Sequence, residues 1–171
     1  MSSDLRKIKK ATPKRNENIL RLFVYGSLKR GHWNHRRFCA TVLTIQPAEV
    51  WGRLYHLPGG YPAIELPEDR ILAEGTIDPI ADTQKLHFER ELNFERPEGD
   101  WDLILGELLT FNDPQNVIPP IDWLEGFSPG KLCLYQRAMT TVLSNNVKQS
   151  AYLYRMLKVT EGYRLPREYR G

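Results

Sequence analysis

The chain has 171 residues, of which 41% are hydrophobic and 26% are charged, and its formal net charge is +3. This length suits a single domain with its own core, and no run approaches the roughly 18 apolar residues of a membrane-spanning helix. The two cysteines have neither metal-ligand spacing nor the density of a disulfide scaffold, so we expect a soluble cytoplasmic protein in which Cys39 and Cys133 are buried free thiols.

Lysine and arginine crowd the N-terminal end of the chain. We expect residues 1–17 to form a disordered basic tail, residues 18–160 to form one domain, and residues 161–171 to form a C-terminal tail. A basic tail can bind nucleic acid, which leaves an RNA-associated protein open as a minor alternative. No RNA- or DNA-binding motif accompanies this tail, however, and a nucleic-acid partner is therefore disfavoured.

The first predicted strand runs from Ile19 to Tyr25. Its nearly continuous apolar character is typical of a strand that is covered on both faces. It stops at Tyr25-Gly26-Ser27-Leu28, where the glycine lets the backbone approach a neighbour closely or adopt a conformation barred to bulkier residues. From these residues alone, the segment is a strand that ends in a turn with exposed backbone amides.

A helix and three strands are predicted next. Apolar residues at helical spacing indicate a helix over residues 35–43, with Asn34 as its N-cap. Residues 50–57, 63–66 and 71–77 are rich in strand-forming residues, and turn residues follow the first of these runs.

Residues 78–102 contain a run of alternating apolar and polar residues. Leu86, Phe88, Leu92 and Phe94 alternate with polar residues, which favours a half-buried strand, although a helix stays open. With the turn signal after Phe94, this pattern predicts a hairpin that could cover a pocket or join subunits.

The last third of the domain begins with a predicted strand over residues 101–111. A short helix is then expected to start at Pro119 and Pro120 and to end at Gly126. Residues 132–143 and 147–154 should form a closing hairpin, because turn-forming residues join them. The elements show no repeating βαβ period, so the pattern predicts an α+β domain.

Two separated groups of residues carry a family resemblance. The first is Tyr25-Gly26-Ser27-Leu28 with Lys29-Arg30-Gly31 and Asn34, and the second is Asp122-x-Leu124-Glu125-Gly126 with Tyr135-x-Arg137. Together they resemble the γ-glutamylcyclotransferase-like superfamily, near the γ-glutamylamine cyclotransferases, over residues 20–154. Each motif is short, but their order and separation make the joint match more specific. The resemblance implies a small mixed β-barrel with flanking helices and a pocket at one mouth. Residues 78–102 are longer than the simplest members of this family need, so the resemblance also identifies them as an insertion.

Glu125 is the candidate catalytic residue. A carboxylate at the C-terminal end of a helix, among apolar neighbours, should have a raised pKa. Such a group can accept and return a proton near neutral pH, although an ordinary surface glutamate stays open from the residues alone. The resemblance implies a γ-glutamyl cyclotransferase that releases 5-oxoproline and an amine or amino acid from a small γ-glutamyl substrate, with Glu125 as general acid/base and no cofactor.

The resemblance also implies the substrate-binding residues: Tyr25, Gly26, Ser27, Leu28, Tyr135 and Tyr154. The backbone amides of the first motif would bind the substrate α-carboxylate or the oxyanion, and the choice between these stays open. The Tyr135 hydroxyl would contact the glutamyl group, although from the residues alone it could be an ordinary strand aromatic. Tyr25 is either a core residue or part of the pocket wall. Ser27 stands where threonine is common in the closest relatives, which leaves the hydroxyl but bears on substrate preference.

Other acids compete with Glu125. Glu107 is the second choice, Glu74 is a weaker one, and Asp122 is expected to form local hydrogen bonds. The four histidines lack a metal-binding or nucleophile-pairing pattern, so no metal is expected. The alternative function is a non-catalytic small-ligand-binding or interaction domain of the same fold. The oligomeric state is not predicted.

Overall fold

The computed structural model describes residues 18–82 and 91–170. The expected tail over residues 1–17, and Leu86 and Phe88 of the expected central strand, lie outside the described residues. In chain order the elements are β1 Leu20–Val24, α1 Trp33–Phe38, β2 Thr44–His56, β3 Pro62–Glu65, the 3₁₀ helix η1 Glu68–Arg70, β4 Ile71–Glu74, β5 Asp102–Phe111, α3 Pro114–Glu125, β6 Gln136–Ser144, β7 Val147–Arg155 and β8 Tyr163–Leu165.

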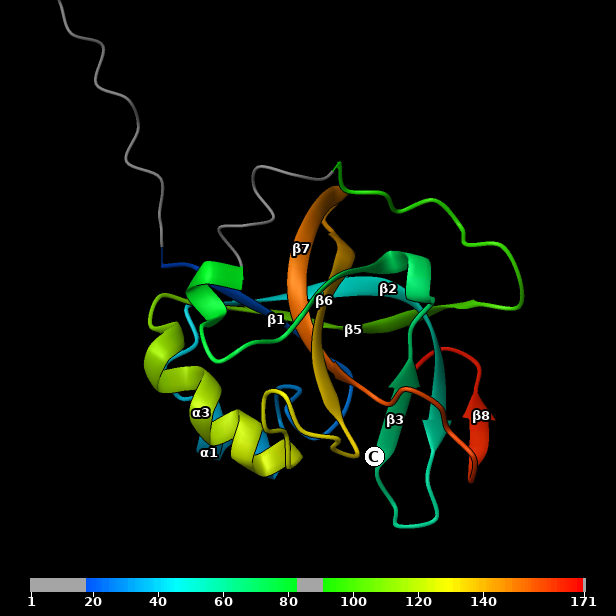
Figure 1. The fold of residues 1–171 in the computed structure, drawn as a ribbon, viewed down its shortest axis with the longest axis horizontal. Helices are drawn as coiled ribbons and strands as arrows, with labels where there is room; N and C mark the ends of the chain where they lie inside the picture. Colours follow the sequence, from blue (N-terminus) through cyan, green and yellow to red (C-terminus); the bar gives the residue numbers. More distant parts are fainter. Residues whose placement is uncertain (1–17, 83–90, 171) are drawn as a thin grey trace, which may run out of the picture.

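Five strands close into a mixed barrel in the order β2, β5, β1, β7 and β6 (Figure 1). Glu49 of β2 pairs with Leu143 of β6, and this contact closes the ring. Only the β1–β7 pairing within the ring is parallel, through Leu22 and Tyr152, whereas the other pairings are antiparallel. The predicted α+β domain with a small mixed barrel and flanking helices is confirmed.

Strand β2 belongs to two sheets because it is long. It pairs with β5 as far as Gly52, and from Arg53 onward it pairs with β3, with β8 on its other side (Figure 1). A Cβ atom at Gly52 would lie 2.8 Å from the Glu65 carbonyl oxygen. Only glycine therefore allows the two backbones to meet at the point where β2 leaves the barrel.

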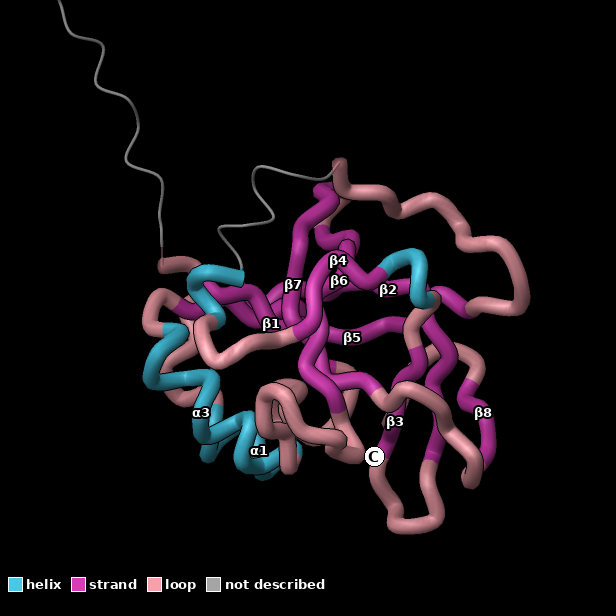
Figure 2. The backbone as a smooth tube through the Cα atoms, viewed as in Figure 1, coloured by secondary structure: helices cyan, strands magenta, loops and turns pink. Residues whose placement is uncertain are grey.

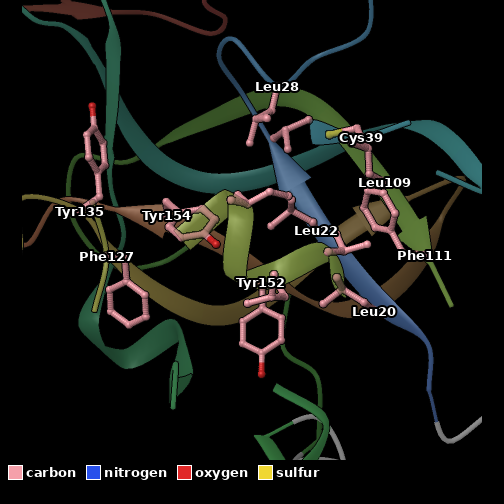
Figure 3. Packing of buried hydrophobic residues seen from close by; sticks show 14 of the residues in the cluster. Leu20, Leu22, Leu28, Cys39, Leu109, Phe111, Phe127, Tyr135, Tyr152 and Tyr154 are labelled. Carbon is pink, nitrogen blue, oxygen red and sulfur yellow. The ribbon is translucent and has the colours of Figure 1, made fainter. Parts of the chain in front are cut away.

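The apolar residues form two cores, and β1 contributes to both. All five barrel strands supply one core, which includes Phe23 and Ile104 and fills the barrel. The other core includes Leu20 and Leu22 together with Ile121 of α3 (Figure 3). Because alternate β1 side chains enter opposite cores, the prediction of a strand buried on both faces is confirmed, although β1 is shorter than predicted.

Both helices differ in extent from the prediction. α1 ends at Phe38, and His32 rather than Asn34 is its N-cap. α3 starts at Pro114, five residues before the predicted start, and the two expected starting prolines lie inside it. Both prolines are exposed, and the carbonyls left without a helical N–H donor are those of the exposed Gln115 and Asn116, which water can reach.

The described part of residues 78–102 does not form the predicted hairpin. Residues 79–82 form a helical turn, and residues 91–101 form an irregular loop outside the barrel (Figure 2). The loop is held by hydrogen bonds to β2, from Trp51 Nε1 to the Phe94 carbonyl and from Arg53 Nε to the Asp100 carbonyl. The alternating pattern alone predicted a strand, but side-chain hydrogen bonds from β2 hold this loop where strand pairing was expected.

The chain's end packs on the domain. β8 pairs with β2, and the buried Tyr169 donates a hydrogen bond to the Gly60 carbonyl at 2.8 Å. Both cysteines are free, as predicted, but Cys133 is only partly buried. Burial raises the pKa of the Cys39 thiol to about 12. Within the described residues, no helix is long and apolar enough to cross a membrane.

Candidate active site

A cavity of about 460 Å³ opens where the end of β1 meets the end of α3. Every residue that the sequence predicts for catalysis or substrate binding lines it: residues 25–28, Glu125, Tyr135 and Tyr154. These residues come from the β1–α1 turn, the last turn of α3, the segment just before β6, and β7. The barrel therefore brings together groups that are about a hundred residues apart in the sequence.

The turn after β1 leaves backbone amides available. The Lys29 N–H donates to the Gly26 carbonyl at 3.0 Å, which closes the turn. No described residue accepts a hydrogen bond from the N–H groups of Gly26, Ser27 or Leu28. Gly26 is required for close approach rather than for a left-handed backbone, because a Cβ atom there would lie 2.7 Å from Pro62 Cγ.

Helix α1 holds this turn in place. Asn34 Nδ2 donates to Ser27 Oγ at 2.9 Å, which leaves the serine O–H free to donate elsewhere. The His35 Nδ1–H group donates to the Leu28 carbonyl at 2.8 Å. Leu28 is itself buried in the core beneath the turn. The amides at the end of β1 are thus supported by side chains from the next element.

Glu125 is the last residue of α3. Gly126 follows in a left-handed conformation with φ of 65°, and the N–H of Phe127 donates to the Asp122 carbonyl at 2.8 Å. This C-cap ends the helix at the cavity. Burial raises the pKa of the Glu125 carboxyl from 4.5 to about 7. Within the described residues, no side chain or backbone group donates a hydrogen bond to this carboxylate.

Three buried tyrosines form the inner walls, and two of them bind backbone carbonyls. Tyr25 donates to the Tyr154 carbonyl at 2.7 Å, and Tyr135 donates to the Pro62 carbonyl at 2.8 Å. Burial is the main cause that raises the pKa of the Tyr25 and Tyr135 phenols, and the nearby Glu125 charge adds to it. Both phenols therefore stay neutral, and their oxygens can still accept a hydrogen bond from a ligand.

A polar network lies behind these walls. Asp122 accepts hydrogen bonds from the Tyr154 hydroxyl and from Arg137, and Arg137 also donates to the Thr76 carbonyl. The Arg137 guanidinium is buried between the rings of Phe127 and Tyr152. Asp122 thus links α3 to β6 and β7 over long sequence separations, whereas local hydrogen bonds were expected for its side chain.

Comparisons with known proteins agree with this architecture. A family described as gamma-glutamyl cyclotransferase, AIG2-like, matches residues 22–92, which include the β1–α1 turn. The solution structure of an Arabidopsis thaliana protein has a TM-score of 0.53 and 16% identity, and covers 85% of this chain and 75% of that one. Residues 22–92 are thus similar to this family, and the Arabidopsis structure shares the fold of this chain.

Two crystal structures are also similar to this chain. YkqA from Bacillus subtilis has a TM-score of 0.50 and 17% identity over 86% of this chain, which spans only 38% of the YkqA chain. An AIG2-like protein from mouse has a TM-score of 0.45 and 16% identity over 84% of this chain and 81% of its own. No curated protein matches the sequence.

The sequence analysis missed several residues that line the cavity. Tyr61, Pro62, Trp123 and Leu134 also line the cavity. Trp123 and Leu134 lie beside motif residues, so their position was a usable signal. Tyr61 and Pro62 carried no signal, because they reach the cavity only through the fold of the β2–β3 hairpin.

The acids that competed with Glu125 in the sequence analysis lie elsewhere in the fold. Glu107 on β5 accepts a hydrogen bond from the Arg30 N–H at 2.6 Å, and Glu74 on β4 forms an ion pair with Arg155 at 2.7 Å. Neither lines the cavity. Among the described residues, no cluster of histidine, cysteine and acidic side chains could hold a metal ion. The described residues of 78–102 do not line the cavity either.

Proposed function

We propose that this protein is a γ-glutamyl cyclotransferase that releases 5-oxoproline and an amine or amino acid from a small γ-glutamyl substrate, with Glu125 as general acid/base. The observation that carries the proposal is the shared cavity of Glu125 and the free amides of residues 26–28. The family match supports a cyclotransferase-type activity in general terms.

Glu125 suits the proton transfers of this reaction. The substrate α-amine arrives mostly as ammonium and must lose a proton before it can attack. With a pKa of about 7, the Glu125 carboxyl is largely ionised in mildly alkaline conditions and accepts that proton. The α-nitrogen then bonds to the γ-carbonyl carbon. As the bond from that carbon to the leaving nitrogen breaks, Glu125 returns the proton to the leaving nitrogen. The α-nitrogen loses its second proton to solvent, which leaves the lactam N–H of 5-oxoproline and a neutral amine.

The β1–α1 turn supplies the complementary part of the proposed site. Cyclisation places negative charge on the γ-carbonyl oxygen, and a free backbone N–H can stabilise it. The three amides and the Ser27 hydroxyl provide enough donors for this oxygen and for the substrate α-carboxylate. The tyrosine walls would hold the glutamyl group folded, which brings the amine near its own carbonyl.

The test is release of 5-oxoproline from γ-glutamyl substrates by the purified full chain. Glu125→Gln should lower kcat/KM by about a hundredfold or more, because it removes the proton acceptor and keeps the side-chain shape. Glu107→Gln is the matched control and should keep wild-type activity. Wild-type protein that binds γ-glutamyl compounds but never releases 5-oxoproline would support the alternative, a non-catalytic binding domain.

A further inference from the structure

The mouth of the cavity is apolar and exposed. Trp123, Leu134 and Tyr61 line it, and their exposed fractions are 73%, 56% and 45%. They come from three separate segments: α3, the segment before β6, and the turn between β2 and β3. Large apolar side chains that gather in solvent at one place mark a binding surface.

Trp123 is the most exposed of these three residues. It lies two residues before Glu125 on α3, yet it is not part of either core. Trp33 on α1 is similarly exposed, at 68%, but does not line the cavity. The two tryptophans therefore form a natural pair in which one faces the site and the other does not.

The residues that line the cavity carry little formal charge with which a ligand could pair. In the described part of the chain, Glu125 is the only lining residue that carries a formal charge near neutral pH. A carboxylate on the departing group would find no cation there and would be repelled by Glu125. An ammonium on that group would compete with the substrate α-ammonium for the same carboxylate.

The positions of the polar and apolar groups in the cavity suit one orientation of the substrate. The free amides and the Ser27 hydroxyl suit the charged glutamyl head, and they belong to the β1–α1 turn. A substrate anchored at this turn with its γ-carbonyl beside Glu125 extends its N-substituent toward the other segments of the lining. Those segments present Trp123, Leu134 and Tyr61.

We propose that the departing amine carries an uncharged apolar group, alkyl or aryl, which packs against Trp123, Leu134 and Tyr61. This inference depends on the proposed function, and it narrows the substrate class to γ-glutamyl amides of apolar amines. Packing of such a group favours the transition state through area removed from water, since the rim side chains are exposed when the site is empty.

The experiment compares γ-glutamyl amides that differ only at the far end of the substituent: the n-pentylamide, the 5-aminopentylamide and the 5-carboxypentylamide, with the methylamide as the baseline. The n-pentylamide should have the highest kcat/KM for 5-oxoproline release, by about tenfold or more over each charged analogue. Equal rates, or a higher rate for a charged analogue, would overturn the inference and leave the proposed function intact. No release from any substrate would overturn both.

Variants of Trp123 and Trp33 test where the apolar substituent binds. Trp123→Ala should lower the ratio of kcat/KM for the pentylamide to that for the methylamide by about tenfold, because it removes the largest apolar surface at the mouth. Trp33→Ala should keep the wild-type ratio. Leu134→Ala provides a second test, with a smaller fall in the same ratio. An unchanged ratio in both rim variants would rule out the apolar mouth as the site of the substituent.

Discussion

The Tyr154 hydroxyl donates a hydrogen bond of 2.7 Å to Asp122 Oδ1, one helical turn before Glu125. The other carboxylate oxygen of Asp122 pairs with the buried Arg137. The helix end that carries Glu125 is thereby tied to two barrel strands, β6 and β7, through one carboxylate. The position of Glu125 thus depends on Asp122 and Arg137, neither of which lines the cavity.

Asp122→Ala should destabilise the fold by about 3–5 kcal/mol, because it leaves the buried Arg137 guanidinium without its counter-ion. Tyr154→Phe should cost only about 1 kcal/mol, since it removes one hydrogen bond and keeps the ring. Urea unfolding of both variants measures the two free energies. If Asp122→Ala costs no more than Tyr154→Phe, the ion pair is not the main contribution of Asp122.

The pH profile of kcat/KM should rise with an apparent pKa near 7 on its acid side. The reason is that burial raises the pKa of Glu125 to about 7, and the carboxyl must be ionised to accept the α-ammonium proton. Initial rates of 5-oxoproline release between pH 5 and 9 provide the measurement, and Glu107→Gln should keep the same acid limb. An acid limb near the ordinary glutamate value of 4.5 would contradict the raised pKa of Glu125.

Glu125→Gln should stabilise the folded protein at alkaline pH. Because the folded pKa of about 7 lies above the ordinary 4.5, the folded state binds the proton more tightly. The stability from this group is fully present below pH 4.5 and is lost as the pH rises through 7. At pH 8 the wild type should therefore be less stable than the variant by up to about 3 kcal/mol.

Urea unfolding at pH 5, 6, 7 and 8 measures that difference. The gap between Glu125→Gln and the wild type should widen with pH and level off above 7. A gap that stays constant across this range would show that the Glu125 carboxyl titrates similarly in the folded and unfolded states.

Gly26→Ala should lower kcat/KM more than tenfold, because the new Cβ atom would press on Pro62 Cγ and displace the free amides of the turn. Pro62→Ala removes the atom that the new methyl group meets and keeps the backbone carbonyl that Tyr135 binds. A double-mutant cycle with these two substitutions measures the coupling. If their effects simply add, the close approach of Gly26 to Pro62 does not control the turn.

Much of the secondary structure could be predicted because local patterns agree with the fold. The continuous apolar run of β1 reflects burial on both faces, and Asn145 and Asn146 adopt the positive φ angles that a tight hairpin turn needs. The predicted helix over residues 35–43 failed in its second half, since β2 begins at Thr44 and the chain leaves α1 after Phe38.

By itself, the sequence predicted an α+β domain from its strand and helix patterns, and the resemblance carried by its short motifs implied the barrel and the candidate site residues, because both kinds of signal depend on neighbours along the chain. Only the tertiary structure decided that the free amides after β1 and the Glu125 carboxyl share one cavity, and that Tyr61, Trp123 and Leu134 form its apolar mouth. Barrel closure and the packing of α3 against β1 produce that juxtaposition. Contacts of this kind join residues that are distant in sequence, and no local pattern records them.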